Sequence, residues 1–342
     1  MCPDVRFLVQ SEDHLRFVIT LRITFRRIIG VWLVLSFGAI PYAFAQAHTA
    51  DREGAGAVQT QMRNVMYHYT DSLAVLIKSL DGELLPVDPT AYPVFDNKES
   101  FRLRADHAEI TIDAPDLCNI FNTYVFSRAN TPVTGVSLGI ENGKLKIRGK
   151  LHQVGVIPFE TEGTLWPTPD GRILLHVGKI KAMHVPVTGI LNLFGVDVAD
   201  LIKTGKIPGV QSSGDDLILD PALLLPPPHL EGKVTAVRIE GQSVLLTFGD
   251  RNHVEKSLQV GNYMSYRGNK LGFGKLTMTD SDMFLIDMDP ADPLDFFLDR
   301  YKAQLAAGYT KITPRFGLRV YIRDFNKLGK AAGKKNLPAA KN

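Results

Sequence analysis

The chain has 342 residues, of which 45% are hydrophobic and 22% are charged, and this composition excludes an intrinsically disordered protein and a multi-span membrane protein. The formal net charge of +3 is too small to indicate nucleic-acid binding by itself. The length is sufficient for one large domain or for two ordinary ones.

Residues 1–45 have the pattern of a secretory signal. Arg26 and Arg27 precede an apolar run over residues 28–40, which is too short to be a comfortable membrane span. Pro41 ends the run, and Ala43-Phe44-Ala45 supplies small residues at the −3 and −1 places of a signal-peptidase site. We therefore predict cleavage after Ala45 and export to the periplasm or cell envelope. An uncleaved membrane anchor is the alternative.

The first half of the mature chain alternates between polar and apolar residues before a helical pattern appears. Residues 46–60 are small and polar and are predicted to form a flexible lead-in. Period-two alternation predicts strands near 65–69, 73–77 and 101–112. An amphipathic helix is predicted over residues 115–126, because the following apolar residues share one helical face: Leu117, Ile120, Phe121, Tyr124 and Val125.

Residues 136–151 form the most regular alternating ribbon of the chain. Asn142-Gly143 predicts a two-residue hairpin turn, because this pair accepts positive φ at both central positions. The second strand carries a row of basic residues on one face, namely Lys144, Lys146, Arg148 and Lys150. This row is either the solvent-facing side of an antiparallel hairpin or a contact for anionic lipid headgroups. Trp166, near the next turn, either packs over a sheet edge or enters a bilayer interface.

Two further helices are predicted from apolar spacing. One covers residues 188–205, and the other begins at Asp292, which suits a helix cap, and runs through Leu305. The predicted organisation is therefore a curved-sheet domain at 61–249, a smaller C-terminal α+β extension at 250–326 and a disordered basic tail at 327–342.

Sequence motifs for catalysis are absent. The chain has no nucleotide-binding glycine fingerprint, no G-x-S-x-G elbow and no H-E-x-x-H pair. The Asp-rich segment 280–295 lacks the spacing of an EF-hand loop, and a turn, a strand face and a helix cap explain its aspartates. Cys118 would be the one cysteine left after signal cleavage and is expected to pack in a core. We expect a protein that is not an enzyme, with no catalytic residues, no metal and no cofactor. An enzyme that uses the Asp-rich segment 280–295 together with calcium is a further alternative.

The segments "LGIENGKLKIRGKLHQVGVIPFETEGTLWPTPDGRILLHVGKIKAMHVPV" and "LFGVDVADLIKTGKIPGV" resemble those of the LmeA-type bacterial exported lipid-binding proteins, small relatives of the tubular lipid-binding (TULIP) fold. The resemblance covers residues 101–249 and rests on pattern. It implies an α+β fold in which a long, strongly curved antiparallel sheet wraps around one or two amphipathic helices. It also implies an apolar tunnel for acyl chains and no catalytic residues.

The predicted function is non-catalytic binding of a phospholipid or another long apolar ligand in the bacterial cell envelope, as a carrier or assembly factor. Transient membrane contact is expected, and nucleic-acid binding is not. A packed core would show the same alternation as a tunnel wall, so the alternative is an envelope scaffold that binds protein partners through sheet edges or the C-terminal segment. The predicted lining residues are Leu117, Phe121, Tyr124, Val136, Leu138, Ile140, Leu145, Ile147 and Leu151.

Overall fold

The computed structural model describes residues 56–126, 132–153, 155–182, 207–250, 256–258 and 261–330. The predicted signal segment 1–45 and the predicted helix at 188–205 lie outside the described residues. Most of the predicted lead-in and of the basic tail also lies outside them. All described residues belong to one of the chain's two compact units. No helix among them is long and apolar enough to cross a membrane.

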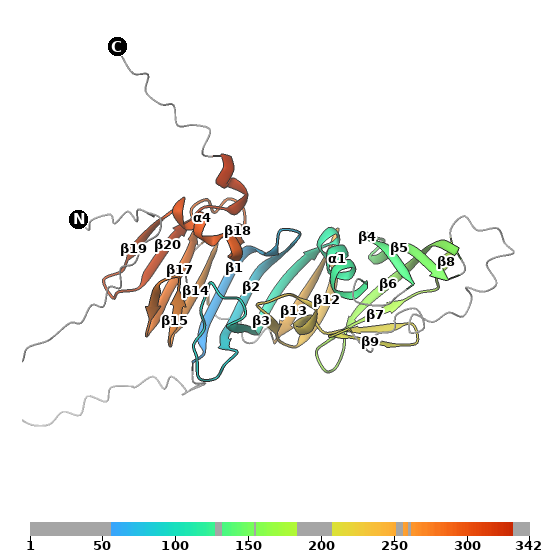
Figure 1. The fold of residues 1–342 in the computed structure, drawn as a ribbon, viewed down its shortest axis with the longest axis horizontal. Helices are drawn as coiled ribbons and strands as arrows, with labels where there is room; N and C mark the ends of the chain where they lie inside the picture. Colours follow the sequence, from blue (N-terminus) through green and yellow to red (C-terminus); the bar gives the residue numbers. More distant parts are fainter. Residues whose placement is uncertain are drawn as a thin grey trace, which may run out of the picture. The chain divides into compact units, whose positions relative to one another are not determined.

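A large mixed sheet contains eleven of the described strands (Figure 1). Its main path runs in the order β12-β13-β3-β2-β1-β14-β17-β20-β19, with β11 beside β3 and β18 beside β1. Most neighbours are antiparallel, and the three parallel pairs are β1 with β18, β3 with β11 and β17 with β20. The strands are β1 (Val58–Thr70), β2 (Leu73–Pro86), β3 (Phe101–Asp113), β11 (Leu230–Glu231), β12 (Val234–Glu240), β13 (Ser243–Gly249), β14 (Tyr263–Gly268), β17 (Ser281–Asp287), β18 (Leu294–Phe297), β19 (Tyr309–Ile312) and β20 (Leu318–Ile322).

A small antiparallel sheet contains seven described strands in the order β4-β5-β6-β7-β10-β9, with β8 beside β6. These are β4 (Val133–Glu141), β5 (Lys144–Gln153), β6 (Gly155–Pro167), β7 (Ile173–Val177), β8 (Lys181–Ala182), β9 (Val210–Ser213) and β10 (Asp216–Leu219). A separate two-stranded ribbon is formed by β15 (Leu271–Phe273) and β16 (Leu276–Met278). One continuous apolar core cluster includes residues of both large and small sheets.

The sheet-dominated α+β class is confirmed, but the prediction of one long sheet wrapped around its helices is wrong. The described strands form two main sheets, and neither closes on itself. The physical reason is that alternation determines which face of a strand is buried and leaves open which strand lies beside it. At the end of β3 the chain leaves the large sheet through a helix and starts a new sheet at β4.

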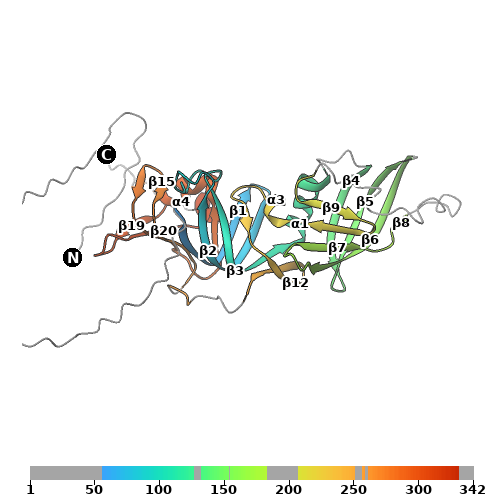
Figure 2. The same cartoon turned by 90° about the horizontal axis from the view of Figure 1, so that it is seen from below.

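The helix predicted over 115–126 is confirmed. It consists of α1 (Ala114–Ile120) followed directly by the π-helical turns of η1 (Phe121–Phe126). The Asp113 side chain caps α1 by accepting a hydrogen bond from the backbone N–H of Asp116 at 3.0 Å. Figure 2 shows the small-sheet strands on one side of α1 and the large sheet on the other.

The hairpin predicted at Asn142-Gly143 is also confirmed. Both residues have positive φ, +53° and +71°, and Glu141 pairs with Lys144 across the turn. This register places Leu138 opposite Ile147 and Ile140 opposite Leu145, so that apolar residues share the inner face of the small sheet.

The continuous helix predicted from Asp292 to Leu305 is wrong in its first half. Residues Leu294–Phe297 form β18, which is followed by η5 (Leu298–Arg300) and α4 (Tyr301–Ala306). β1 turns away from β14 at Asn64, whose φ is +53°, and β18 pairs with the part of β1 beyond that point. Pairing between distant strands therefore prevails over the local helical spacing. Two further short helices are α3 (Pro221–Leu224) and η6 (Phe325–Lys330).

Candidate apolar binding site

An apolar pocket lies between the large and small sheets, and we call it the inter-sheet pocket. It holds about 710 Å³ of space not filled by protein atoms, part of which is open to solvent. The helix α1–η1 forms one wall, β3 and β13 form a second, and β5, β6, β7 and β10 form a third. Its lining is entirely apolar: Ile110, Ile112, Leu117, Ile120, Phe121, Val125, Leu145, Leu165, Ile173, Leu219, Pro221, Leu224, Leu225, Leu230, Val244, Leu246 and Phe248.

A second pocket lies against the inner face of the small sheet, and we call it the small-sheet pocket. It holds about 480 Å³ of unfilled space, also partly open. Thr161 is the one polar lining residue, and its hydroxyl donates a 2.8 Å hydrogen bond to the Gly178 carbonyl. The other lining residues are Phe121, Phe126, Val133, Val136, Leu138, Ile147, Phe159, Leu175, Val177, Ile180 and Leu217.

Phe121 lines both pockets and thus forms part of the wall between them. Its side chain is buried, and its ring packs against that of Phe126 with a centroid distance of 6.1 Å. The helix around it is fastened to β4, because the Asn122 side-chain amide donates to the Val136 carbonyl at 2.7 Å. Cys118 Sγ lies 3.3 Å from the same carbonyl oxygen. These bonds position Phe121 where the two pockets meet.

The predicted lining residues separate into three groups. Leu117 and Leu145 line the inter-sheet pocket, and Phe121 lines both. Val136, Leu138 and Ile147 line the small-sheet pocket. Tyr124, Ile140 and Leu151 line neither pocket; Ile140 and Leu151 are buried in the core, and Tyr124 packs against it.

Several lining residues were missed by sequence reasoning because they come from other strands. Ile110 and Ile112 belong to β3, and Val244, Leu246 and Phe248 belong to β13. Alternation predicted the first of these strands, at residues 101–112. β13 lies beside β3 because the two strands pair antiparallel, with Val244 opposite Ile112. No short-range pattern predicts that pairing.

The basic row of β5 is largely paired with glutamates. Lys144 Nζ lies 3.0 Å from Glu162, and Lys146 and Arg148 both bind Glu160, with Arg148 Nε at 2.8 Å. Hydrogen bonds from Lys146 and Arg148 hold the pKa of Glu160 below its usual range. The two glutamates of β6 therefore balance most of the positive charge of the basic row, as cross-strand ion pairs do on the solvent-facing side of a sheet.

The remaining residues proposed for headgroup contact are Lys150 and Trp166. Lys150 is exposed, and its cross-strand neighbours are Thr134 and Pro158. Trp166 is about half exposed, and its ring lies 6.3 Å from that of His176. Neither lines a pocket.

The first turn of α1 contains a carboxyl group with a perturbed pKa. Burial, together with the neighbouring Asp113, raises the pKa of Asp116 to about 6, while a hydrogen bond from the Ala74 backbone N–H opposes the shift. This group lies on the same helix that lines both pockets.

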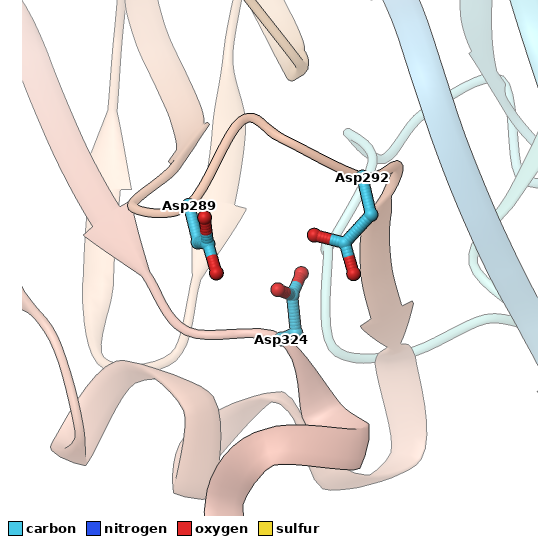
Figure 3. A group of neighbouring side chains, drawn as sticks. All are labelled: Asp289, Asp292 and Asp324. Atoms are coloured by element: carbon cyan, nitrogen blue, oxygen red, sulfur yellow. The ribbon is translucent and has the colours of Figure 1, made fainter.

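Three carboxylates converge just after β17 and β20 and just before β18, namely Asp289, Asp292 and Asp324 (Figure 3). Lys327 Nζ binds all three, at 2.9, 2.7 and 2.8 Å respectively. These hydrogen bonds raise the pKa of Lys327 well above its usual range. The ammonium group occupies the centre of the cluster, where a metal ion would have to bind.

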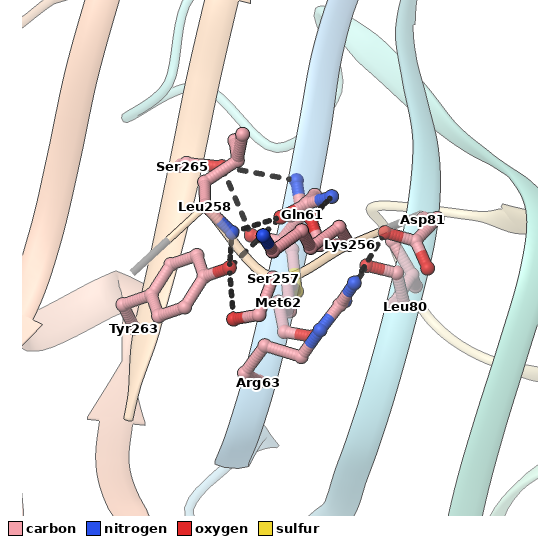
Figure 4. A network of polar contacts seen from close by, with 10 residues as sticks. All are labelled: Gln61, Met62, Arg63, Leu80, Asp81, Lys256, Ser257, Leu258, Tyr263 and Ser265. Atoms are coloured by element: carbon pink, nitrogen blue, oxygen red, sulfur yellow. Dashed lines mark hydrogen bonds and ion pairs between the residues drawn. The ribbon is translucent and has the colours of Figure 1, made fainter. Parts of the chain in front are cut away.

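A polar cluster joins buried residues of β1 and β14 to the exposed residues 256–258 (Figure 4). The Tyr263 hydroxyl donates to Gln61 Oε1 at 2.8 Å and accepts from the Leu258 backbone N–H at 2.9 Å. Ser257 Oγ lies 2.9 Å from the same hydroxyl. Beside it, Arg63 forms a 2.6 Å ion pair with Asp81. These hydrogen bonds fasten residues 256–258 to β1 and β14.

Comparison with protein-family models, curated proteins and solved structures found no significant match to this chain.

Proposed function

We propose that the protein binds a lipid or another long apolar ligand without chemically altering it. The observation that carries this proposal is the inter-sheet pocket, whose seventeen lining residues are all apolar. Removing one CH₂ group from water is worth ~0.8 kcal/mol, so an enclosed apolar lining is what an acyl chain requires in an aqueous compartment.

The polar part of such a ligand remains outside the pockets. Neither lining contains a charged side chain, and the one polar group, the Thr161 hydroxyl, already donates to Gly178. A charged or strongly polar headgroup would be buried there without a partner, which is costly. The ligand is therefore a molecule with a long apolar part and a polar end that stays in solvent.

We further propose that the two pockets are segments of one tunnel divided by Phe121, as the likeness to the LmeA-type and tubular lipid-binding proteins implies. The shared residue supports this arrangement. The cell envelope as the location, with the role of carrier or assembly factor, rests on the export pattern of residues 26–45.

Mass spectrometry of organic extracts from the purified protein tests the proposal. The wild type should release a lipid in stoichiometric amount. Leu117→Trp places an indole in the inter-sheet pocket and should lower the lipid content, whereas Leu223→Trp should not, because Leu223 is exposed on α3 and lines neither pocket.

Two results would refute lipid binding. One is a wild type that releases no lipid and binds no fluorescent fatty acid; this measurement needs no variant and stands even if Leu117→Trp fails to fold. The other is equal lipid content in the two tryptophan variants. A protein that co-purifies in place of lipid would support the scaffold alternative.

A further inference from the structure

The turn between β19 and β20 presents an apolar tip to solvent. Phe316 is 91% exposed and Ile312 is 66% exposed, the two highest values among the large apolar side chains that the structure describes. Hydrogen bonds within the turn close it. Phe316 N–H donates to the Thr313 carbonyl at 2.9 Å, and Gly317 N–H donates to Thr313 Oγ1 at 2.8 Å. The exposed ring therefore projects from a hydrogen-bonded turn.

Phe316 is unfavourable for the fold in two ways. Its ring is in water. Its φ is +62°, in the left-handed region that bulky residues rarely adopt and that glycine adopts without strain. A glycine at this position would remove both costs. The aromatic side chain thus contributes nothing to folding that would explain its presence.

The tip carries more cationic than acidic side chains. Lys311 and Arg315 are exposed on either side of Ile312, and Arg319 follows on β20. The nearest acidic group on β17, Asp282, is bound by Arg319 at 3.1 Å. With Asp280 on the preceding turn included, the three cationic side chains outnumber the two acidic ones.

We propose that the tip, comprising Lys311, Ile312, Arg315 and Phe316, inserts into the surface of an anionic lipid bilayer. The Phe316 ring and Ile312 would enter the boundary between headgroups and acyl chains, while the two cationic groups remain among the headgroups. Behind them, Tyr309 and Tyr321 stack with a centroid distance of 4.5 Å, and their amphipathic rings suit the polar level of the interface.

A bilayer fits this surface better than a protein does. β19 is an edge strand of four residues and contains Lys311, and short length and lysine both oppose the addition of a further strand (Figure 1). The surface area of two protruding side chains is also far smaller than the roughly 800 Å² that each partner buries in a stable protein interface.

The tip is separate from the pockets. β19 lies six strand intervals from β3 along the large sheet, or roughly 29 Å at the usual strand spacing. Membrane contact at the tip and ligand binding in the pockets can therefore succeed or fail independently.

Co-sedimentation with vesicles tests the proposal, using vesicles of pure phosphatidylcholine and vesicles containing phosphatidylglycerol. All variants have the same N-terminus as the wild type, so any vesicle binding by residues before Ala55 is equal in all of them. Phe316→Gly should weaken binding to the anionic vesicles about tenfold without lowering Tm, because glycine accepts the backbone conformation. Lys311→Gln and Arg315→Gln should each weaken it about fivefold. The control is Val156→Thr, which alters an exposed apolar residue of the small sheet and should change nothing.

Phe316→Trp provides a second measurement that retains an aromatic ring. Its added fluorescence, relative to that of the wild type, should be quenched by lipids with brominated acyl chains. Equal vesicle binding by Phe316→Gly and the wild type, or an added fluorescence in Phe316→Trp that brominated lipids leave unquenched, would overturn the proposal. So would a dimer that forms without vesicles and is lost in Phe316→Gly, since the tip would then bind a second copy of the chain. Unchanged lipid content in all tip variants would leave the proposed pocket function intact.

Discussion

The backbone N–H of Ala74 in β2 donates a hydrogen bond of 3.1 Å to Oδ1 of Asp116 in α1. This bond fastens the first turn of the pocket-lining helix to the large sheet. Because Asp116 is half-buried next to Asp113, its charge is poorly solvated at the place where the helix is attached.

The stability of the protein should therefore contain a component that increases as the pH falls. The pKa of Asp116 is about 6 in the folded state, above the value near 3.9 of an unfolded chain. Between these values the folded state binds more protons, so acidification from pH 7 to pH 4.5 stabilises it through this group. Solvent screening limits the effect to on the order of 1 kcal/mol. In urea titrations at the two pH values, Asp116→Asn should lack this component, and a variant with the same pH response as the wild type would contradict the assignment.

Phe121→Ala should connect the two pockets. Removing a buried aromatic side chain costs ~3–5 kcal/mol of unfolding free energy, and the new space would be continuous with both pockets. We expect the variant to bind longer acyl chains than the wild type, as measured by competition among fatty acids of increasing length. Phe121→Leu, which retains part of the wall, should show a smaller change in chain-length preference. An unchanged preference in Phe121→Ala would show that this ring does not divide the ligand space.

Tyr263→Phe should destabilise the protein by ~1–3 kcal/mol, because Gln61 and the Leu258 N–H lose a buried partner. Tyr266→Phe on the same strand is a matched control. Both side chains are buried, but the Tyr266 hydroxyl has only a 3.7 Å contact with Met264 Sδ. Hydrogen exchange should also become faster at residues 256–258 in the first variant and not in the second. Equal destabilisation by the two changes would contradict this role of the polar cluster.

Lys327→Met should leave three carboxylates close together without their ammonium partner. Their oxygens lie within 4.8 Å of one another, so the variant should become less stable and should regain stability when calcium is added. The wild type should show no such response in the same thermal melts, because its lysine already neutralises the cluster. Calcium stabilisation of the wild type would mean that the ion displaces Lys327, contrary to our interpretation.

Local features of the fold could be predicted from the sequence. The turn at Asn142-Gly143 follows from the backbone preferences of two adjacent residues, and the helix at 115–126 follows from a stripe that its own spacing defines. The pairing of distant strands could not be predicted from the sequence. The segment at Leu294–Phe297 has helical spacing but pairs with a strand more than two hundred residues earlier, and strands β4 to β10 build a second sheet before the chain returns to the first.

The candidate site was predictable to the same extent. Alternation identified Val136, Leu138 and Ile147 as an apolar face, and the structure places them beside a pocket. The same alternation placed Ile140 and Leu151 on that face, where they are packed in the core instead. Whether an inner residue meets empty space or another side chain depends on which elements lie opposite, and this depends on the pairing of distant strands.

The position of β1 within the large sheet has a consequence for how the chain acquires its structure. One side of β1 pairs with the adjacent β2, but the other side pairs with β14 and then with β18, both near the C-terminus. Until those strands have been synthesised, one long side of β1 has no hydrogen-bonding partners and can pair with other chains. Such non-local pairing slows folding. The large sheet is therefore completed only after β14 and β18 have been synthesised, and the chain must be protected from aggregation until then.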